Sequence, residues 1–350
     1  MPHSNAPRRP EPGADYVRAL EGAFEAAVAV AGLVEHGLGV GGRELLLRFA
    51  GPALEPALLP ALEHVLSEPA REPAGVVHLW DTASTGVPLP EPPWRATDIG
   101  PLGEVAMRGL GAVHVPADGR LTIRATGSRN VHWWAAHADV VPWWERGAPL
   151  RVVFHWLLTD PRRQLIHAAA VGEGARGVLL PGPSGSGKST LALACLESGM
   201  TYAGDDYVLL DVSDPPVAHS LYASARVDVQ TLARFPALTA TQTHREGEKT
   251  VLALGEAHRE RIRLQLQVDA VVIPRRKRTR TSAVSRASAG EGLLALAPSS
   301  ALQLPDRARG TLRVAAELVR RKPVYRLEVG SDQRGAVAAL RSILAEINPR

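Results

Sequence analysis

The stretch Gly182-Pro183-Ser184-Gly185-Ser186-Gly187-Lys188-Ser189-Thr190 decides how the rest of the sequence is interpreted. It fits the pattern G-x-x-x-x-G-K-[ST], in which glycines allow a positive φ that a Cβ atom would strain. In such a loop the N–H groups turn inward as a nest for phosphate oxygens, and the next helix adds its positive N-terminal end. The pattern assigns Lys188 to the β- and γ-phosphates and the Ser189 hydroxyl to Mg²⁺.

The residues on either side supply the setting that this motif requires. Residues 177–180 form a short apolar run with strand character. Residues 190–196 are strong helix formers and precede Gly199, which suits the end of a helix. A strand, a glycine loop and a helix in this order predict that residues 182–190 bind a nucleotide; an ordinary Gly/Ser turn is the alternative.

Length, charge and cysteine content narrow the class of protein. The chain has 350 residues, enough for two domains, and its 40 basic and 36 acidic residues nearly cancel, so charge gives no case for nucleic-acid binding. No apolar run reaches the length of a membrane span, and residues 1–12 lack the apolar segment of a signal peptide. The only cysteine, Cys195, is expected to be a core residue. A cytoplasmic protein without membrane contact is the prediction.

The pattern of the chain changes near residue 148, and we expect two domains. Residues 1–13 are predicted to be a disordered tail, and residues 14–148 a smaller α+β domain. Within that domain the expected elements are a helix at 14–31, a helix at 54–66 broken near Pro60, strands at 44–49, 76–80 and 131–134, and a hairpin at 113–115 and 121–124. Tryptophan occurs in two pairs, Trp133-Trp134 and Trp143-Trp144. Core packing and an aromatic ligand surface are both open for these pairs.

Residues 149–350 are predicted to form the nucleotide-binding domain. The expected helices are 151–158 and 333–347, and the expected strands are 164–171, 207–210, 268–273 and 324–329. Residues 221–227 fit a strand or a loop, and the polar residues 239–248 are predicted to be a loop. The strand at 164–171 should turn at 172–177 and pair antiparallel with the strand that enters the glycine loop, which is unusual among P-loop proteins.

Two adjacent carboxylates, Asp205 and Asp206, follow Ser189 by 16 and 17 residues at the start of a strand. Phosphoryl transfer needs a held Mg²⁺ and a group that orients or deprotonates the acceptor hydroxyl, and such a pair could divide the two tasks. Repulsion within the pair and burial would raise the pKa of at least one of them. A pair that only caps a turn is the alternative.

His167 and the basic run 275–280 are less specific signals. His167 lies in an apolar strand, where a histidine is usually a core residue; the alternative is a polar group near the phosphates and Asp205. The run 275–280 is expected to be a solvated loop, with contact to a substrate phosphate or an acidic peptide as the alternative. Nucleic-acid binding is disfavoured because no aromatic residue interrupts the charges.

Together these motifs resemble the catalytic domain of bacterial HPr kinase/phosphorylase, and more closely the HPr-kinase-related proteins. The resemblance is close over residues 160–212 and weaker beyond. It implies an α/β fold like the nucleotide domain of phosphoenolpyruvate carboxykinase. It also implies transfer of the γ-phosphoryl of ATP, or in some members the use of pyrophosphate, to a serine hydroxyl.

The resemblance also implies roles for individual residues. Asp205 would be the general base, Asp206 would assist at the metal, and His167 would lie near the phosphates. Arg226 is a candidate for stabilising charge at the γ-phosphate. Thr190 departs from the family, whose members have Glu after the loop serine, and the family's C-terminal docking signature is not found. Both departures put HPr itself in doubt as the acceptor, and phosphorylase activity as well.

The resulting hypothesis is an ATP- and Mg²⁺-dependent serine kinase that acts on a peptide or small protein. A kinase for a small-molecule hydroxyl would use the same residues. A protein that binds ATP without turnover, as a sensor or scaffold, is the rival from another class. The sequence decides neither the acceptor nor whether the chain forms a homo-oligomer.

Overall fold

A computed structural model describes residues 12–183, 185–301 and 308–347 of the chain, and the predicted tail lies outside these residues except at its last two positions. The chain forms two compact units. The first contains residues up to Gly37, Leu45–Leu54 and Pro69–Val141, and the second contains Leu38–Glu44, Glu55–Glu68 and Pro142–Arg350. Sheets that mix parallel and antiparallel strands run through both units, which confirms the predicted mixed α/β class.

A seven-stranded sheet has the order β3-β1-β2-β4-β7-β6-β5, and most of its residues belong to the first unit. Its strands are β1 (Leu33–Val40), β2 (Arg43–Ala50), β3 (Leu66–Ser67), β4 (Gly75–Asp81), β5 (Leu110–Val115), β6 (Arg120–Ala125) and β7 (Asn130–Ala135). The strands β2, β4 and β7 run parallel, and β5 to β7 form an antiparallel meander that includes the predicted hairpin. The short helices of this region are α2 (Glu55–Leu58), counted with the second unit, and α3 (Thr82–Thr85).

Helix α1 (Pro12–Ala31) covers this sheet because its apolar side chains recur at helical spacing. Tyr16, Leu20 and Phe24 are buried against Trp80 in one cluster. Trp133, from the first predicted tryptophan pair, is only 2% exposed and is a core residue.

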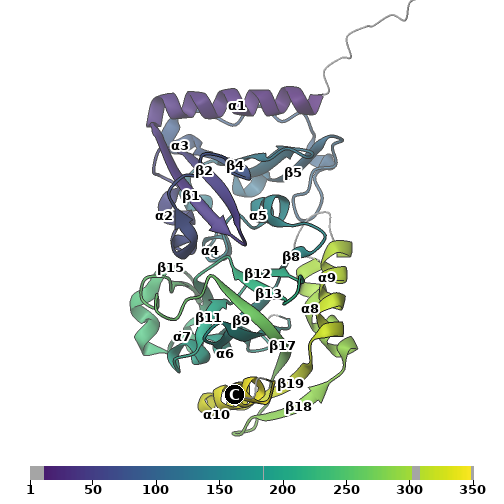
Figure 1. Cartoon of the computed structure of the whole chain (residues 1–350). Coiled ribbons are helices and arrows are strands. Elements are labelled where there is room, and N and C mark those ends of the chain that lie inside the picture. The colour runs from purple at the N-terminus through teal and green to yellow at the C-terminus, as the bar shows by residue number, and fades with distance from the viewer. Residues whose placement is uncertain (1–11, 184, 302–307, 348–350) are drawn as a thin grey trace, which may run out of the picture. The chain divides into compact units, whose positions relative to one another are not determined.

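The second unit is built on a nine-stranded sheet (Figure 1). The path β11-β9-β10-β17-β13-β12-β8 contains seven strands, and β17 also pairs with β19, which pairs with β18. Their bounds are β8 (Arg163–Ile166), β9 (Ala168–Glu173), β10 (Arg176–Pro181), β11 (Thr201–Gly204), β12 (Val208–Asp211), β13 (Val217–Ser220), β17 (Gln265–Arg276), β18 (Ala283–Ala287) and β19 (Val324–Val329). A separate three-stranded sheet contains β14 (Ser224–Asp228), β15 (Gln242–Glu246) and β16 (Lys249–Ala253).

Helices cover both faces of the nine-stranded sheet. The helices of this unit are α4 (Trp143–Arg146), α5 (Arg151–Leu158), α6 (Lys188–Glu197), α7 (Val229–Leu232), α8 (Ala289–Ala301), α9 (Ala308–Arg321) and α10 (Gln333–Ile347). Alternate residues of β10 point to opposite cores: Val178 and Leu180 pack with α6 and α10, and Leu179 packs with α8 and α9. Cys195 is buried in the first of these cores, as expected. Among the described helices, none is both long and apolar enough to cross a bilayer.

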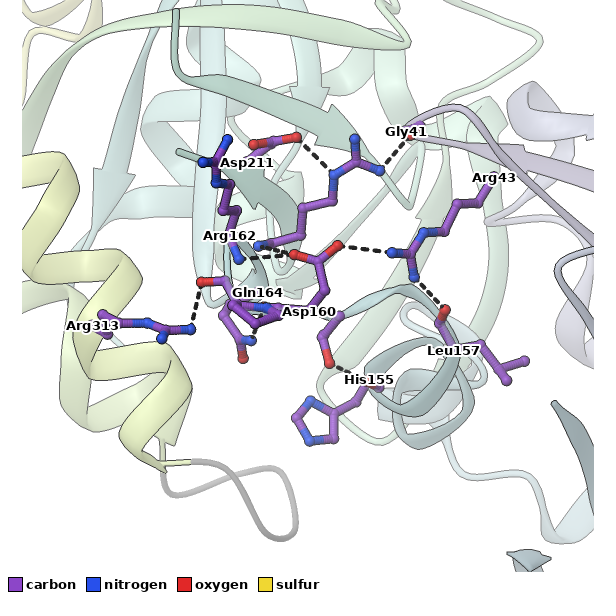
Figure 2. A network of polar contacts seen from close by, with 12 residues as sticks. Gly41, Arg43, His155, Leu157, Asp160, Arg162, Gln164, Asp211 and Arg313 are labelled. Carbon is purple, nitrogen blue, oxygen red and sulfur yellow. Dashed lines mark hydrogen bonds and ion pairs between the residues drawn. The ribbon is translucent and has the colours of Figure 1, made fainter. Parts of the chain in front are cut away.

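A network of polar contacts holds the turn between β1 and β2 within the second unit (Figure 2). Asp160 accepts hydrogen bonds from Arg43 Nη2 at 2.8 Å and from the backbone N–H of Arg163 at 3.0 Å. The Arg163 guanidinium donates to Asp211 at 2.7 Å and to the carbonyl of Gly41 at 2.8 Å. This group of contacts, called the Asp160 network below, contains no residue of the glycine loop.

Two predicted elements are wrong in this unit. Residues 164–171 are not one strand, because the chain leaves the sheet at His167 and re-enters as β9 beside different neighbours. Residues 239–248 are not only a loop, since 242–246 form β15, an exposed strand paired with β16. The antiparallel pairing of β9 with β10, by contrast, is confirmed.

Candidate active site

The glycine loop joins β10 to α6 with three glycines at positive φ. Gly182, Gly185 and Gly187 have φ values of 143°, 80° and 98°, which side chains with a Cβ rarely adopt. Gly187 is the N-terminal cap of α6, and as a glycine it has no side chain that could accept a hydrogen bond from the first turn of the helix. The N-terminus of α6 is therefore free of the usual cap that would compete with an anion. Ser184, predicted as part of this site, lies outside the described residues.

Lys188 is folded into the loop that precedes it. Its side chain is 6% exposed, and Nζ donates hydrogen bonds to the carbonyls of Gly182 at 2.6 Å and Pro183 at 3.2 Å. Burial lowers the pKa of Lys188, and the nearby charges of Asp205 and Asp206 oppose that shift. The ammonium group is thus held where a phosphate over the loop would meet it, and it has to exchange two carbonyl contacts for phosphate oxygens.

Asp205 follows β11 directly and is buried beside the loop. Asp205 is only 2% exposed, and its Oδ1 has no hydrogen-bond partner among the described residues. Burial raises the pKa of Asp205 to about 6, although a hydrogen bond with the Ser189 hydroxyl acts in the opposite direction. Near neutral pH this carboxylate is ionised yet ready to take a proton, which is what a general base requires.

Asp206 is held in the opposite electrostatic state. Burial alone would raise its pKa, but the charge of Arg226 and a hydrogen bond from His167 outweigh burial and hold the pKa of Asp206 well below its ordinary value. Arg226 Nη2 forms an ion pair with Asp206 Oδ1, and His167 Nε2 lies 3.2 Å from the same oxygen. Asp206 therefore stays a carboxylate, and its Oδ2 is buried without a described partner.

His167 and Arg226 reach Asp206 from different parts of the fold. His167 lies at the break between β8 and β9, where its ring stacks on Tyr207 with 5.2 Å between centroids. Arg226 lies on β14 of the three-stranded sheet, and its Nη1 donates to the carbonyl of Trp144 at 3.0 Å. The break in the predicted strand is thus what turns His167 toward the carboxylate pair.

A pocket of about 330 Å³ opens beside these groups. Its lining includes most of the predicted residues: His167, Gly185, Gly187, Lys188, Ser189, Thr190, Asp205, Asp206 and Arg226. The lining also includes residues that the sequence did not single out as site residues: Trp143, Val227, Asp228, Thr231, Lys249 and Arg276. Gly182, Pro183 and Ser186 shape the loop without appearing in the lining, and the buried Ser186 hydroxyl has no partner among the described residues.

Two of the unpredicted lining residues had a signal in the sequence. Trp143 belongs to the second tryptophan pair and lies under the Arg226 guanidinium, whose Cζ is 5.7 Å from the ring centroid. Arg276 is the second residue of the basic run and ends β17, and a Cβ on Gly187 would meet its Cγ at 3.2 Å. Arg276 therefore lies along the glycine loop, where it could contact an anion bound there.

The donor set around Asp205 fits a phosphate-bound Mg²⁺ better than a metal held by protein alone. In the described part of the chain, no group of three or more His, Cys, Asp or Glu side chains could hold a metal ion. The buried oxygens Asp205 Oδ1 and Asp206 Oδ2, without described partners, and the Ser189 hydroxyl are nevertheless the hard ligands that Mg²⁺ prefers. Magnesium usually keeps several waters and takes one or two carboxylates together with substrate phosphates.

Comparison with known proteins gives a distant likeness in fold. No family model matches the chain, and no curated protein matches its sequence. A solved structure that resembles it is the HPr(Ser) kinase/phosphatase from Coxiella burnetii, with a TM-score of 0.30 and 12% sequence identity. The match covers 53% of this chain and 98% of that one. At this distance the roles of individual residues are argued from the geometry of this chain alone.

Proposed function

We propose that this protein is an ATP- and Mg²⁺-dependent phosphotransferase that moves the γ-phosphoryl group to the hydroxyl of a serine in a peptide or small protein. One observation carries the proposal. Two adjacent buried carboxylates beside a glycine loop have pKa values shifted in opposite directions, to about 6 for Asp205 and well below the ordinary value for Asp206. When the pKa values of two neighbouring carboxylates differ in this way, one can act as a base while the other stays ionised.

The side chains divide the work of the reaction as follows. Asp205 accepts the proton of the acceptor hydroxyl at Oδ1, which has no hydrogen-bond partner among the described residues. Lys188 leaves the carbonyls of Gly182 and Pro183 to bind phosphate oxygens, together with the N–H groups at the start of α6. Arg226 and Lys188 face the charge that spreads over the transferred group. Mg²⁺, held by Ser189 and Asp206, would neutralise phosphate charge in the complex.

The hydroxyl acceptor follows from the nature of the base. A carboxylate with a pKa of about 6 can assist the departure of a hydroxyl proton as the phosphoryl group arrives. Serine as the acceptor rests on the sequence resemblance described above. The polar pocket of about 330 Å³ leaves a small-molecule hydroxyl as the competing acceptor.

Transfer of label from γ-³²P-ATP with Mg²⁺ into a soluble lysate of the source cell tests the proposal. We expect a labelled protein or peptide with the wild-type chain and no such band with Lys188→Ala or Asp205→Asn. ATP affinity, measured by calorimetry on the same samples, should fall for Lys188→Ala and stay close to wild type for Asp205→Asn, because Lys188 is the member of this pair whose ammonium is placed to bind phosphate oxygens.

The other outcomes separate the rival functions. Label that appears only in small molecules, and disappears with Asp205→Asn, would replace the serine acceptor with a metabolite hydroxyl. ATP binding without any transfer, including without slow ATP hydrolysis, would contradict a phosphotransferase and leave a nucleotide sensor. Absence of ATP binding by the wild type would reject the nucleotide site as well.

A further inference from the structure

Arg151, which no sequence motif singled out, is close enough to Asp206 to interact with its charge. It is the first residue of α5, and its Cζ lies 5.1 Å from the ring centroid of Trp144 and 5.6 Å from that of Tyr207. A guanidinium is planar and stacks on aromatic faces, so two rings define its position more firmly than one. Arg151 is absent from the described lining of the pocket.

The Tyr207 ring connects Arg151 to the site, because it contacts both Arg151 and His167. The His167 imidazole is stacked on the Tyr207 ring at 5.2 Å with 28° between the ring planes. His167 Nε2 in turn lies 3.2 Å from Asp206 Oδ1. The chain of contacts therefore runs from Arg151 through one aromatic ring to the imidazole that binds the carboxylate.

The backbone at the start of α5 breaks two local rules. Leu150 has a φ of 58° and is the only described non-glycine residue with positive φ. Arg151 places a cation at the positive end of a helix, where an anion would be favoured. Strained backbone and unfavourable charge persist when the surrounding structure or the function requires them, and such strain gathers at active sites.

We propose that Arg151 is a positioning residue for His167. Its guanidinium fixes the Tyr207 ring, and that ring holds the imidazole in hydrogen-bonding distance of Asp206. Trp144 also helps to position a partner of Asp206, because its carbonyl accepts a hydrogen bond from Arg226, which forms an ion pair with Asp206. The second tryptophan pair thus supports both cations near Asp206, one through a ring and one through a carbonyl.

Histidine ring signals in ¹H–¹⁵N spectra of the full-length chain test this inference without a substrate. The His167 signal among the 12 histidines is identified by its loss in His167→Gln. We expect Arg151→Met to shift that signal, because the imidazole loses its fixed orientation. Arg163→Met, which breaks a partly buried arginine contact in the Asp160 network, should leave the His167 signal in place. A His167 signal that is unmoved in folded Arg151→Met would overturn the proposal.

A conservative variant and a rate measurement complete the test. Arg151→Lys keeps the charge but lacks the planar face, so it should also shift the His167 signal even if Arg151→Met fails to fold. The rate arm rests on the proposed function: kcat for phosphoryl transfer should fall about 100-fold in Arg151→Met with an almost unchanged KM for ATP, because a small misplacement of the groups around Asp206 lowers the rate of the chemical step. An unchanged kcat in a folded Arg151→Met would contradict the inference. Absence of transfer by the wild type would reject the proposed function and leave the spectra to decide.

Discussion

The Asp160 network and the carboxylate pair of the pocket are two polar clusters of the same unit. They differ in how many of their carboxylate oxygens accept hydrogen bonds. In the Asp160 network all four carboxylate oxygens of Asp160 and Asp211 accept hydrogen bonds. Figure 2 draws those that Asp160 accepts. In the pocket, Asp205 Oδ1 and Asp206 Oδ2 are buried without partners among the described residues. Buried polar atoms are nearly always hydrogen-bonded in proteins, so the exceptions need an explanation.

The difference teaches which cluster serves structure and which serves a ligand. The arginines of the Asp160 network bind carbonyls and carboxylates that the chain itself supplies, so its charged groups are paired within the cluster. Gln164 donates to the Asp160 carbonyl, and its buried Oε1, which has no partner among the described residues, is a neutral amide oxygen. In the pocket, Asp205 Oδ1 and Asp206 Oδ2 have no partner among the described residues, and the Lys188 ammonium is hydrogen-bonded to loop carbonyls. A bound phosphate with its metal could interact with all three groups. Substitutions in the two clusters should therefore affect different properties.

The largest expected effect is on the rate of transfer by Asp205→Asn. The amide cannot accept the proton of the acceptor, so we expect phosphoryl transfer to fall about 1,000-fold, within the usual range for loss of a general base. Single-turnover transfer of ³²P to the identified acceptor measures this. A rate within a few-fold of wild type would remove Asp205 from the chemistry.

Arg163→Met should lower the stability of the fold and leave the nucleotide site unaffected. It leaves Asp211, with a side chain 9% exposed, without its ion-pair partner. Because Arg163 is 27% exposed, we expect a loss of unfolding free energy of about 2 kcal/mol, between the values for exposed and buried pairs. Urea denaturation followed by circular dichroism measures it. The affinity for ATP should not change, and a large change would couple the network to the site.

The pH dependence of transfer should follow Asp205. Its folded pKa of about 6 lies above the ordinary 3.8, so the carboxyl takes up a proton as the pH falls through 6. We expect the rate to fall about tenfold for each pH unit below that point. Asp206, with a pKa held low, should contribute nothing in this window. A rate that stays flat down to pH 5 would exclude Asp205 as the base.

The smallest effect is expected for Arg43→Met, in the exposed part of the Asp160 network. Arg43 and Asp160 are each 31% exposed, so solvent screens their ion pair. Loss of this pair should lower the unfolding free energy by about 0.5–1 kcal/mol, as for other exposed pairs. A loss as large as that of Arg163→Met would show that the network acts as one cooperative unit.

The glycine loop could be predicted because its physics is local. Three glycines, a preceding apolar strand and a following helix former define the backbone within twenty residues, and the structure has each of these elements. The break at His167 could not be predicted in this way. The sequence around it is apolar on both sides, and the chain is interrupted there because β8 and β9 pair with different strands.

Long-range contacts explain most of the other differences. For Arg226 the resemblance implies a role at the γ-phosphate, but nothing in the sequence of its strand indicates that it pairs with Asp206. Arg151 carried no signal because its partners Trp144 and Tyr207 come from separate elements. The sequence predicts a loop where β15 lies because this strand is exposed on both faces and so lacks the alternation of a half-buried strand.

The same substitution in both clusters tests the central claim most directly. Ionised Asp205 opposes folding above pH 6, so at pH 7.5 Asp205→Asn should raise the unfolding free energy of the ligand-free chain by up to about 3 kcal/mol. Asp211 has a lowered pKa and is stabilising when ionised, so Asp211→Asn should reduce stability at the same pH. Paired urea titrations of the two variants decide the matter. Opposite signs are what the account predicts, and a loss of stability in both would contradict the claim that Asp205 is held unsatisfied for a ligand.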